Sequence, residues 1–221
     1  MPPRAILLDF EGVLADTENV HVAAWERTLA LMGWEVSPES CVRGSEMDDH
    51  DFLTDLFFER SIVDGDIKGW VRRKQALTRQ LLADVPPFYP GAAELVRQLH
   101  GKGRLAVVAT TWRENVEVVL KSANLLELID VIVPKELIRS PKPNPACYRR
   151  ALKLLAIPKE QAVVLAASFY GYTAANQADL CTLAVGHRMP RESWPAKTPF
   201  VPDLTDPSAV LKALGFPPSP G

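Results

Sequence analysis

Five short runs of apolar residues punctuate the chain, and none of them alternates with polar residues. Each run is rich in Val, Leu, Ile or Ala, which is typical of parallel strands whose two faces are both buried. The runs cover residues 5–10, 105–110, 131–133, 162–167 and 181–185. The pattern predicts a buried parallel sheet, in which Cys181 is a small buried hydrophobe.

Amphipathic stretches of helical length separate most of these runs. Residues 91–103, 113–125 and 144–158 carry apolar positions at helical spacing, and Gly101 and Gly103 follow the first stretch where a helix would end. Regular alternation of strand and helix predicts an α/β fold with a Rossmann-like, doubly wound parallel sheet.

A long segment without a buried strand interrupts this rhythm at residues 16–88. Trp25, Leu29 and Met32 share one face of a first predicted helix, a polar break at 44–51 precedes a second at 52–58, and a third spans 67–82. We expect Lys74 to lie on the solvated face of that third helix.

These helices predict an inserted α-helical cap domain at residues 16–88, and a core domain made of residues 1–15 and 89–221. The turn sequence Pro-Pro-Phe-Tyr-Pro-Gly at 86–91 closes the insertion. The proline-rich tail after Gly186 is expected to lie over the edge of the sheet.

Composition narrows the class of protein. The chain has 221 residues, of which 47% are hydrophobic and 24% charged, and its net charge of −2 gives no reason to expect a nucleic acid or an anionic membrane as partner. No run approaches the roughly 18 apolar residues that span a bilayer. Three cysteines without a CxxC pair suit a reducing compartment, so we expect a cytoplasmic protein. The sequence does not fix an oligomeric state.

Polar residues stand where the predicted strands end. Asp9 and Glu11 follow the first run, Thr110 ends the second, Lys142 precedes the fourth between two prolines, and Ser168 follows the fourth. In an open parallel sheet, ligands bind beyond the carboxyl ends of the strands, near the point where strand order reverses. The sequence therefore predicts a site at this edge.

The residues at these strand ends, taken in their order along the chain, resemble the motifs of the haloacid dehalogenase-like hydrolase superfamily. The resemblance is closest to its phosphoglycolate phosphatase and β-phosphoglucomutase branch. The resemblance rests on DFEGVLADTE, YPGAAELVRQL and KPNPACY, and it extends over nearly the whole chain. It implies a HAD-like α/β core, a helical cap and a phosphatase that acts on a small phosphorylated metabolite.

The resemblance assigns a role to each residue. Asp9 is ionised at neutral pH, so it can attack phosphorus without a general base and form an aspartyl-phosphate. Glu11, two residues later, points to the same side of an extended chain and could protonate the leaving oxygen. Thr110 and Lys142 would hold and neutralise the phosphoryl oxygens.

Four further residues are candidate substrate contacts. Thr111 and Arg113 occupy the loop after the second strand, Ser168 matches the serine of the family, and His21 lies near the entry to the cap. For Arg113 the alternative is a solvated charge at a helix start. For His21 it is an ordinary position in the first turn of a cap helix.

Two departures from the family pattern weaken the expected magnesium site. The family has a second aspartate where this chain has Glu11, and it places acidic ligands for magnesium where this chain has Ala166 and Ala167. Asp9 and Glu11 remain as candidate ligands, so Mg²⁺ is a doubtful cofactor. The acidic segment at 44–49 also lacks the arginine with which mutases of this branch hold a second phosphate.

Three other interpretations stay open. The chain could be a non-catalytic protein that kept the fold and binds phosphorylated ligands. It could be a metal-independent 2-haloacid dehalogenase, in which the aspartate attacks carbon. The unusual residues could also have been introduced by mutagenesis to trap a complex.

Overall fold

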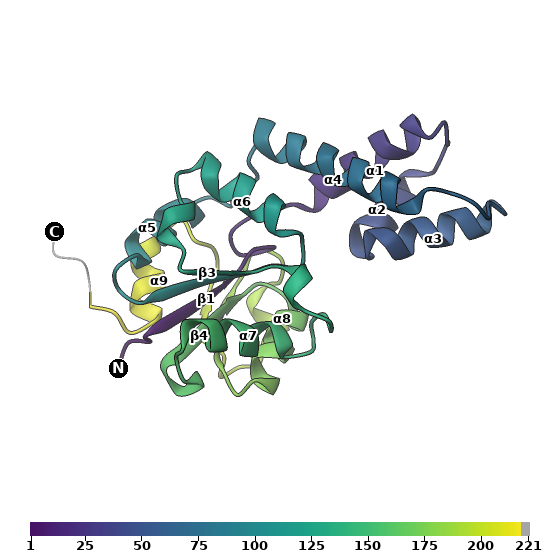
Figure 1. Cartoon of the computed structure of the whole chain (residues 1–221). Coiled ribbons are helices and arrows are strands. Elements are labelled where there is room, and N and C mark those ends of the chain that lie inside the picture. Colours follow the sequence, from purple (N-terminus) through teal and green to yellow (C-terminus); the bar gives the residue numbers. More distant parts are fainter. Residues whose placement is uncertain (218–221) are drawn as a thin grey trace. The chain divides into compact units, whose positions relative to one another are not determined.

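The computed structural model describes residues 1–217, and the last four residues of the expected core domain lie outside the described part. The chain divides into two compact units (Figure 1). One comprises Met1–Asp16 together with Pro87–Gly221, and the other is Thr17–Pro86. We call them the α/β unit and the helical unit.

A single sheet of six parallel strands forms the centre of the α/β unit, in the order β3-β2-β1-β4-β5-β6. The strands are β1 Ala5–Asp9, β2 Arg104–Val108, β3 Val131–Val133, β4 Ala162–Ala166, β5 Cys181–Val185 and β6 Phe200–Val201. The predicted α/β, Rossmann-like parallel fold is thus confirmed. Strand order reverses at β1, which has β2 on one side and β4 on the other.

Helices lie against both faces of the sheet (Figure 1). The helices of this unit are α5 Ala92–Leu99, α6 Arg113–Ser122, α7 Ala146–Leu155, α8 Phe169–Gln177 and α9 Pro207–Ala213. Short 3₁₀ turns occupy Leu126–Leu128, Lys135–Leu137, Lys159–Gln161 and Arg191–Ser193. Figure 1 shows α7 and α8 on one side of the sheet, and α5 and α6 on the other.

The two buried faces explain why the strands lack alternation. Ala5 and Leu7 of β1 belong to the core beneath α7 and α8, whereas Ile6 and Leu8 point to the opposite face. All four are completely buried. A strand covered on both sides gains from apolar residues at every position, as the sequence pattern indicated.

The tail after Gly186 is more regular than expected. It adds β6 to the sheet beside Ala184 and Val185, and it forms α9, which begins with Asp206 as N-cap and Pro207 as first residue. The expectation that the tail only covers the sheet edge was incomplete. A strand of two residues gives no periodicity to detect.

Cys181 is exposed, so its interpretation as a buried hydrophobe was wrong. It is the first residue of β5, and β6 pairs with β5 only at Ala184 and Val185. The thiol therefore stands on the part of β5 that β6 does not reach.

The helical unit contains α1 Glu18–Leu31, α2 Pro38–Glu46, α3 Asp49–Glu59 and α4 Ile67–Asp84. Trp25 and Phe52 meet edge to face at 4.8 Å in its core, and the Trp25 Nε1–H donates to the Gly44 carbonyl at 2.9 Å. A Cβ at Gly44 would lie 2.5 Å from the Phe52 ring, so a glycine is required for this approach.

The polar break expected at 44–51 is much shorter than predicted, because α2 extends through Glu46 and α3 begins at Asp49. Ser37 caps α2 through the Ser40 N–H, and Pro38 occupies the first helical position. These local signals mark the start of a helix whose short, polar sequence hides its periodicity.

Lys74 is buried, with 1% of its surface exposed, so the expectation of a solvated position was wrong. Its ammonium lies 2.8 Å from Asp49 Oδ1, 2.9 Å from His21 Nδ1 and 5.0 Å from the centre of the Trp25 ring. Gln75 also donates to Asp49. Helix α4 therefore carries a buried charge that joins it to α1 and α3.

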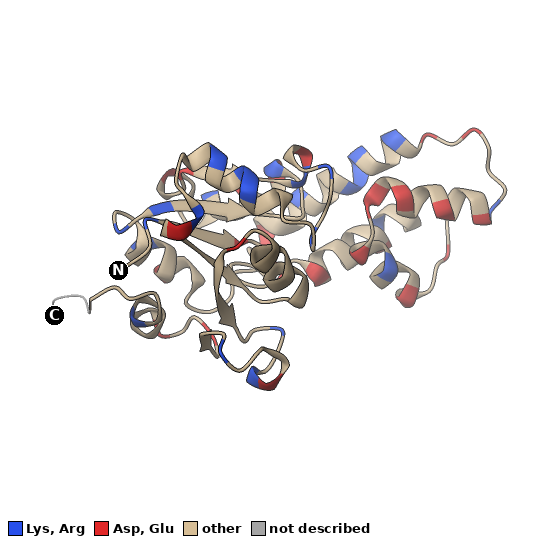
Figure 2. Ribbon diagram, turned by 90° about the horizontal axis from the view of Figure 1, so that it is seen from below, with Lys and Arg blue, Asp and Glu red and all other residues tan. Residues whose placement is uncertain are grey.

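Charged residues of both signs are distributed over both units (Figure 2). In the helical unit, acidic residues recur along α3 and basic residues along α4. No helix among residues 1–217 combines the length and the apolar character needed to cross a bilayer.

Replacing Lys74 by Met is expected to lower the free energy of unfolding by about 3–5 kcal/mol, because Asp49 would then be buried without its cation. The matched control is Glu59→Gln, which breaks the exposed ion pair with Arg43 and should cost less than about 1 kcal/mol. Urea unfolding followed by tryptophan fluorescence measures both. Equal effects would contradict the prediction.

Candidate active site

Asp9 is the last residue of β1, the strand at which the order of the sheet reverses. Only 2% of its surface is exposed. The Phe10 N–H donates to the Val108 carbonyl of β2, and the chain then turns at Gly12, whose φ of +85° favours glycine. The turn fixes the carboxylate at the carboxyl edge of the sheet, where ligands bind in this type of fold.

Two side chains hold Asp9 Oδ1. The Lys142 ammonium lies 2.6 Å from it, and the Tyr148 hydroxyl donates to it at 2.8 Å. Burial by itself would lower the pKa of Lys142, but the neighbouring Asp9, Cys147 and Glu11 together outweigh burial and raise that pKa. Burial, together with the Asp9 charge, raises the pKa of Tyr148 well above its usual value. Both groups therefore keep their protons at neutral pH, as donors to Asp9.

Glu11 reaches across to β2. Both of its carboxylate oxygens accept from the Thr110 N–H, at 3.0 and 3.2 Å. Burial raises the pKa of Glu11, while the Thr110 N–H and the Lys142 ammonium oppose the rise. Raising the pKa of a glutamate makes it a stronger base and a better holder of a proton, which is what a general acid and base needs.

The N-terminus of α8 forms the remaining wall of the site. Ser168 caps this helix, and its Oγ accepts from the Gly171 N–H at 3.1 Å. A Cβ at Gly171 would lie 2.7 Å from Asp9 Oδ2 and 3.2 Å from the Ala166 Cβ. The close approach of α8 to Asp9 thus requires a glycine in the first turn.

Thr111 and Arg113 make contacts within the α/β unit. Thr111 is buried, and its hydroxyl accepts from Asn115 Nδ2 at 2.8 Å. The Arg113 guanidinium donates to the Ile132 carbonyl at 3.0 Å and pairs with Glu117 at 3.6 Å. Both candidate substrate contacts already have protein partners, so their role towards substrate stays a prediction.

His21 belongs to the helical unit, in α1, where its Nδ1 lies beside the Lys74 ammonium. The structure therefore gives this candidate a buried charged neighbour within its own unit. Asp9, Glu11, Thr110, Lys142 and Ser168, by contrast, all come from the α/β unit.

The residues at this edge do not fit a magnesium ion. Asp9 Oδ1 is occupied by a cation and a hydroxyl, both Glu11 oxygens face an N–H group, and Ala166 and Ala167 offer no side-chain oxygen. Residues 1–217 contain no group of three or more His, Cys, Asp and Glu side chains arranged to hold a metal. Mg²⁺ needs an oxygen-rich octahedral shell, which these side chains do not supply.

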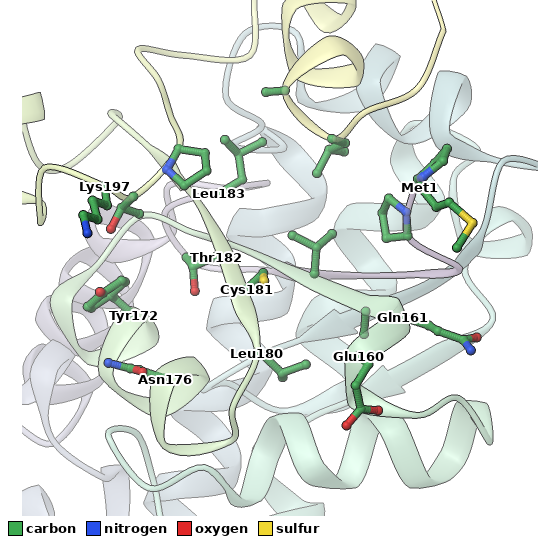
Figure 3. Close-up of a pocket in the computed structure, with 18 of the residues that line it drawn as sticks. Met1, Glu160, Gln161, Tyr172, Asn176, Leu180, Cys181, Thr182, Leu183 and Lys197 are labelled. Carbon is green, nitrogen blue, oxygen red and sulfur yellow. The ribbon is translucent and has the colours of Figure 1, made fainter.

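A pocket of about 800 Å³ lies elsewhere in the same unit (Figure 3). It is lined by the first residues of β4 and β5, by Tyr172 and Asn176 of α8 and by Lys197. Because the strands are parallel, this pocket stands at their amino ends, whereas Asp9 stands at the carboxyl edge. It is therefore separate from the candidate active site.

Tyr148 is the residue of this site that the sequence did not single out. It lies in the first turn of α7, six positions after Lys142, and is completely buried. Its position in the KPNPACY motif was a usable signal, but an aromatic residue at a helix start usually indicates core packing alone.

A family model described as haloacid dehalogenase-like hydrolase matches residues 6–185. Protein CbbY of Cereibacter sphaeroides is 32% identical over 202 residues, which cover 83% of this chain and 84% of that protein. The crystal structure of CbbY from Rhodobacter sphaeroides in complex with phosphate has a TM-score of 0.77 at 28% identity, and the match covers 92% of this chain and 96% of that one. A mutant of the latter protein in complex with xylulose-(1,5)bisphosphate has a TM-score of 0.73, with the same identity and coverage.

Glu11→Gln is expected to stabilise the protein relative to wild type more at pH 8 than at pH 4. The pKa of Glu11 is raised on folding, so ionising this residue opposes folding. That cost is absent below the ordinary pKa of 4.5 and is complete above the folded-state pKa. Urea unfolding at several pH values should show the gap between variant and wild type widening as pH rises. A gap that is constant with pH would contradict this.

Proposed function

Because the chain belongs to the haloacid dehalogenase-like hydrolase family, we propose that it is a phosphomonoester phosphatase that forms an aspartyl-phosphate at Asp9. The observation that carries the proposal is the buried contact between Asp9 and Lys142 at the carboxyl end of β1. It places a carboxylate and a cation together at the edge where this type of sheet binds its ligands.

The chemistry needs two displacements at phosphorus. In the first, an Asp9 oxygen bonds to phosphorus, the ester P–O bond breaks, and Glu11 gives its proton to the leaving oxygen. In the second, Glu11 takes a proton from water, which attacks phosphorus and releases phosphate and free Asp9. The Lys142 ammonium and the Thr110 hydroxyl stabilise the phosphoryl oxygens in both steps.

The raised pKa of Glu11 supports its role in this scheme. A general acid must hold its proton until the leaving oxygen needs it, and a general base must then accept one. Glu11 alternates between the two states, and its hydrogen bond from the Thr110 N–H holds it beside the residue assigned to the phosphoryl group.

The substrate we propose is a small phosphorylated metabolite, and a sugar phosphate is the first class to test. Support comes from the structures of CbbY with phosphate and with xylulose-(1,5)bisphosphate. The net charge of −2 favours neither nucleic acid nor an anionic membrane as partner, and the unpaired thiols favour the cytoplasm.

We further propose that the metal site of the family is eroded in this chain. Asp9 and Glu11 are the carboxylates assigned to this site, and both are engaged by protein donors. Lys142 supplies the positive charge beside Asp9 that the reaction requires. We assign no step to magnesium.

A non-catalytic phosphate-binding protein is the second candidate, and the alanine pair at 166 and 167 favours it. Such a protein would retain Lys142 and the helix α8 N-terminus for an anion while having lost turnover. The phosphate-release experiment below separates it from the phosphatase.

Wild type is expected to release phosphate from at least one of a panel of sugar and small-metabolite phosphate esters, with or without EDTA. Asp9→Asn should lower kcat by about 10⁴-fold or more, because it removes the nucleophile while keeping the side chain's shape. A colorimetric phosphate assay measures both.

Phosphate binding without turnover in every condition would instead support the binding protein. A parallel assay for halide release from 2-haloacids tests the dehalogenase interpretation on the same samples.

Ala167→Asp is expected to create a magnesium response that wild type lacks. The new carboxylate would add an oxygen ligand near Asp9, and a bound ion stabilises the folded state by mass action. The melting temperature is measured while the concentration of MgCl₂ is raised in 10-fold steps. Ala167→Asn is the matched uncharged control. A wild-type melting temperature that rises with magnesium as much as the variant's would contradict an eroded site.

A further inference from the structure

The carboxylate plane of an aspartate rotates easily, since the torsion about the Cβ–Cγ bond is broad and has no sharp staggered wells. A nucleophile, however, reacts efficiently only when its oxygen is aimed at the phosphorus, and a misplacement of about 1 Å can cost about 100-fold in rate. A carboxylate that acts as a nucleophile therefore needs partners that fix its plane.

The polar contacts of the Asp9 side chain converge on one oxygen. Oδ1 receives the Tyr148 hydroxyl at 2.8 Å and the Lys142 ammonium at 2.6 Å. Within residues 1–217, no side chain or N–H group is recorded as a donor to Oδ2, which instead faces the backbone of Gly171. Ala166 and Ala167 add no polar atom on that side.

We propose that Tyr148 is the positioning residue that fixes the carboxylate plane of Asp9 for attack. This inference rests on the proposed phosphatase function. The Tyr148 hydroxyl would then orient the Asp9 carboxylate. In a site with acidic residues at 166 and 167, a metal ion held by those residues would do so instead.

Tyr148 is better suited to this task than Lys142. Its ring is completely buried and belongs to the same core cluster as Ala5, Leu7 and Ala151, so the hydroxyl cannot move far without displacing the core. A lysine ammonium is a point charge on a flexible stem and can follow the phosphoryl group during the reaction. The tyrosine is thus the fixed donor and the lysine the adaptable one.

Complete burial also separates positioning from substrate binding. Tyr148 has no exposed surface, so it cannot touch the substrate, and its effect must pass through Asp9. In the first displacement, the bond forms from Asp9 to phosphorus and the ester bond breaks, with the proton coming from Glu11. Tyr148 keeps its proton throughout and donates the same hydrogen bond in each state.

The test is Tyr148→Phe, which deletes the hydroxyl and keeps the ring that lies 5.0 Å from the Lys142 ammonium. We expect kcat to fall about 10–100-fold while KM stays within about twofold. Tyr172→Phe is the matched control, since Tyr172 lies in α8 with ring contacts to Phe169 and Trp194 and none to Asp9. It should keep wild-type kcat and KM.

A Tyr148→Phe enzyme with wild-type kcat, or with a raised KM and unchanged kcat, would overturn the inference. Failure of the proposed function looks different, because wild type and Tyr172→Phe would then release no phosphate from any ester.

Crystal structures of wild type and Tyr148→Phe decide the positioning role whether or not turnover is found. We expect the Asp9 carboxylate plane to be rotated or disordered in the variant, with Lys142 still beside it. An identical, ordered carboxylate in both structures would overturn the inference. Circular dichroism and melting temperature confirm that the variant is folded before either measurement.

Discussion

A carboxylate with 2% of its surface exposed is stable in a protein only when a cation and hydrogen-bond donors replace the water it has lost. For Asp9 these are the Lys142 ammonium and the Tyr148 hydroxyl. Removing Lys142 would leave the Asp9 charge uncompensated in a region of low dielectric, and removing the Tyr148 hydroxyl would take away a hydrogen bond that replaces lost water. The rest of the α/β unit can be understood as the arrangement that brings these three side chains together from β1, a proline-flanked loop and α7.

The parallel sheet makes this arrangement possible. Parallel strands place all their carboxyl ends at one edge, so Asp9 of β1 and the loop that carries Thr110 meet although about a hundred residues separate them. Helix α7 then packs on the same face as Leu7, which points its first turn, and with it Tyr148, at Asp9. The same edge receives the N-terminus of α8, whose Gly171 permits the close approach.

The sequence predicted the parts of this structure that are long or repeated. Five of the six strands were found because apolar runs buried on both faces are unmistakable, and the family was identified from motifs at their ends. Two short elements were missed. Helix α2 is marked only by its N-cap Ser37 and by Pro38 at its first position, and β6 has two residues. Lys74 was placed on the surface because helical periodicity does not reveal a partner such as Asp49, which arrives from another helix.

The candidate site likewise contains residues that the sequence predicted and one that it did not. Asp9 and Lys142 could be selected by residue type and position, and the structure places them in contact. Tyr148 could not, because its hydroxyl matters only through a contact that spans 139 positions of the chain. Sequence patterns report which face of an element is buried, but not which polar atom finds which partner within the core.

The charges around Asp9 also bear on the proposed chemistry, because they are compatible with alanines at 166 and 167. Acidic residues there would repel Asp9 unless a divalent cation neutralised the group. With alanines, the single negative charge of Asp9 is balanced by Lys142, while Glu11, with its raised pKa, resists adding a second one. Such a site has little net negative charge with which to attract Mg²⁺ from water. Alanines at 166 and 167 and the contacts of Lys142 and Tyr148 with Asp9 therefore fit one charge balance, which is the physical basis for proposing chemistry at Asp9 without a metal.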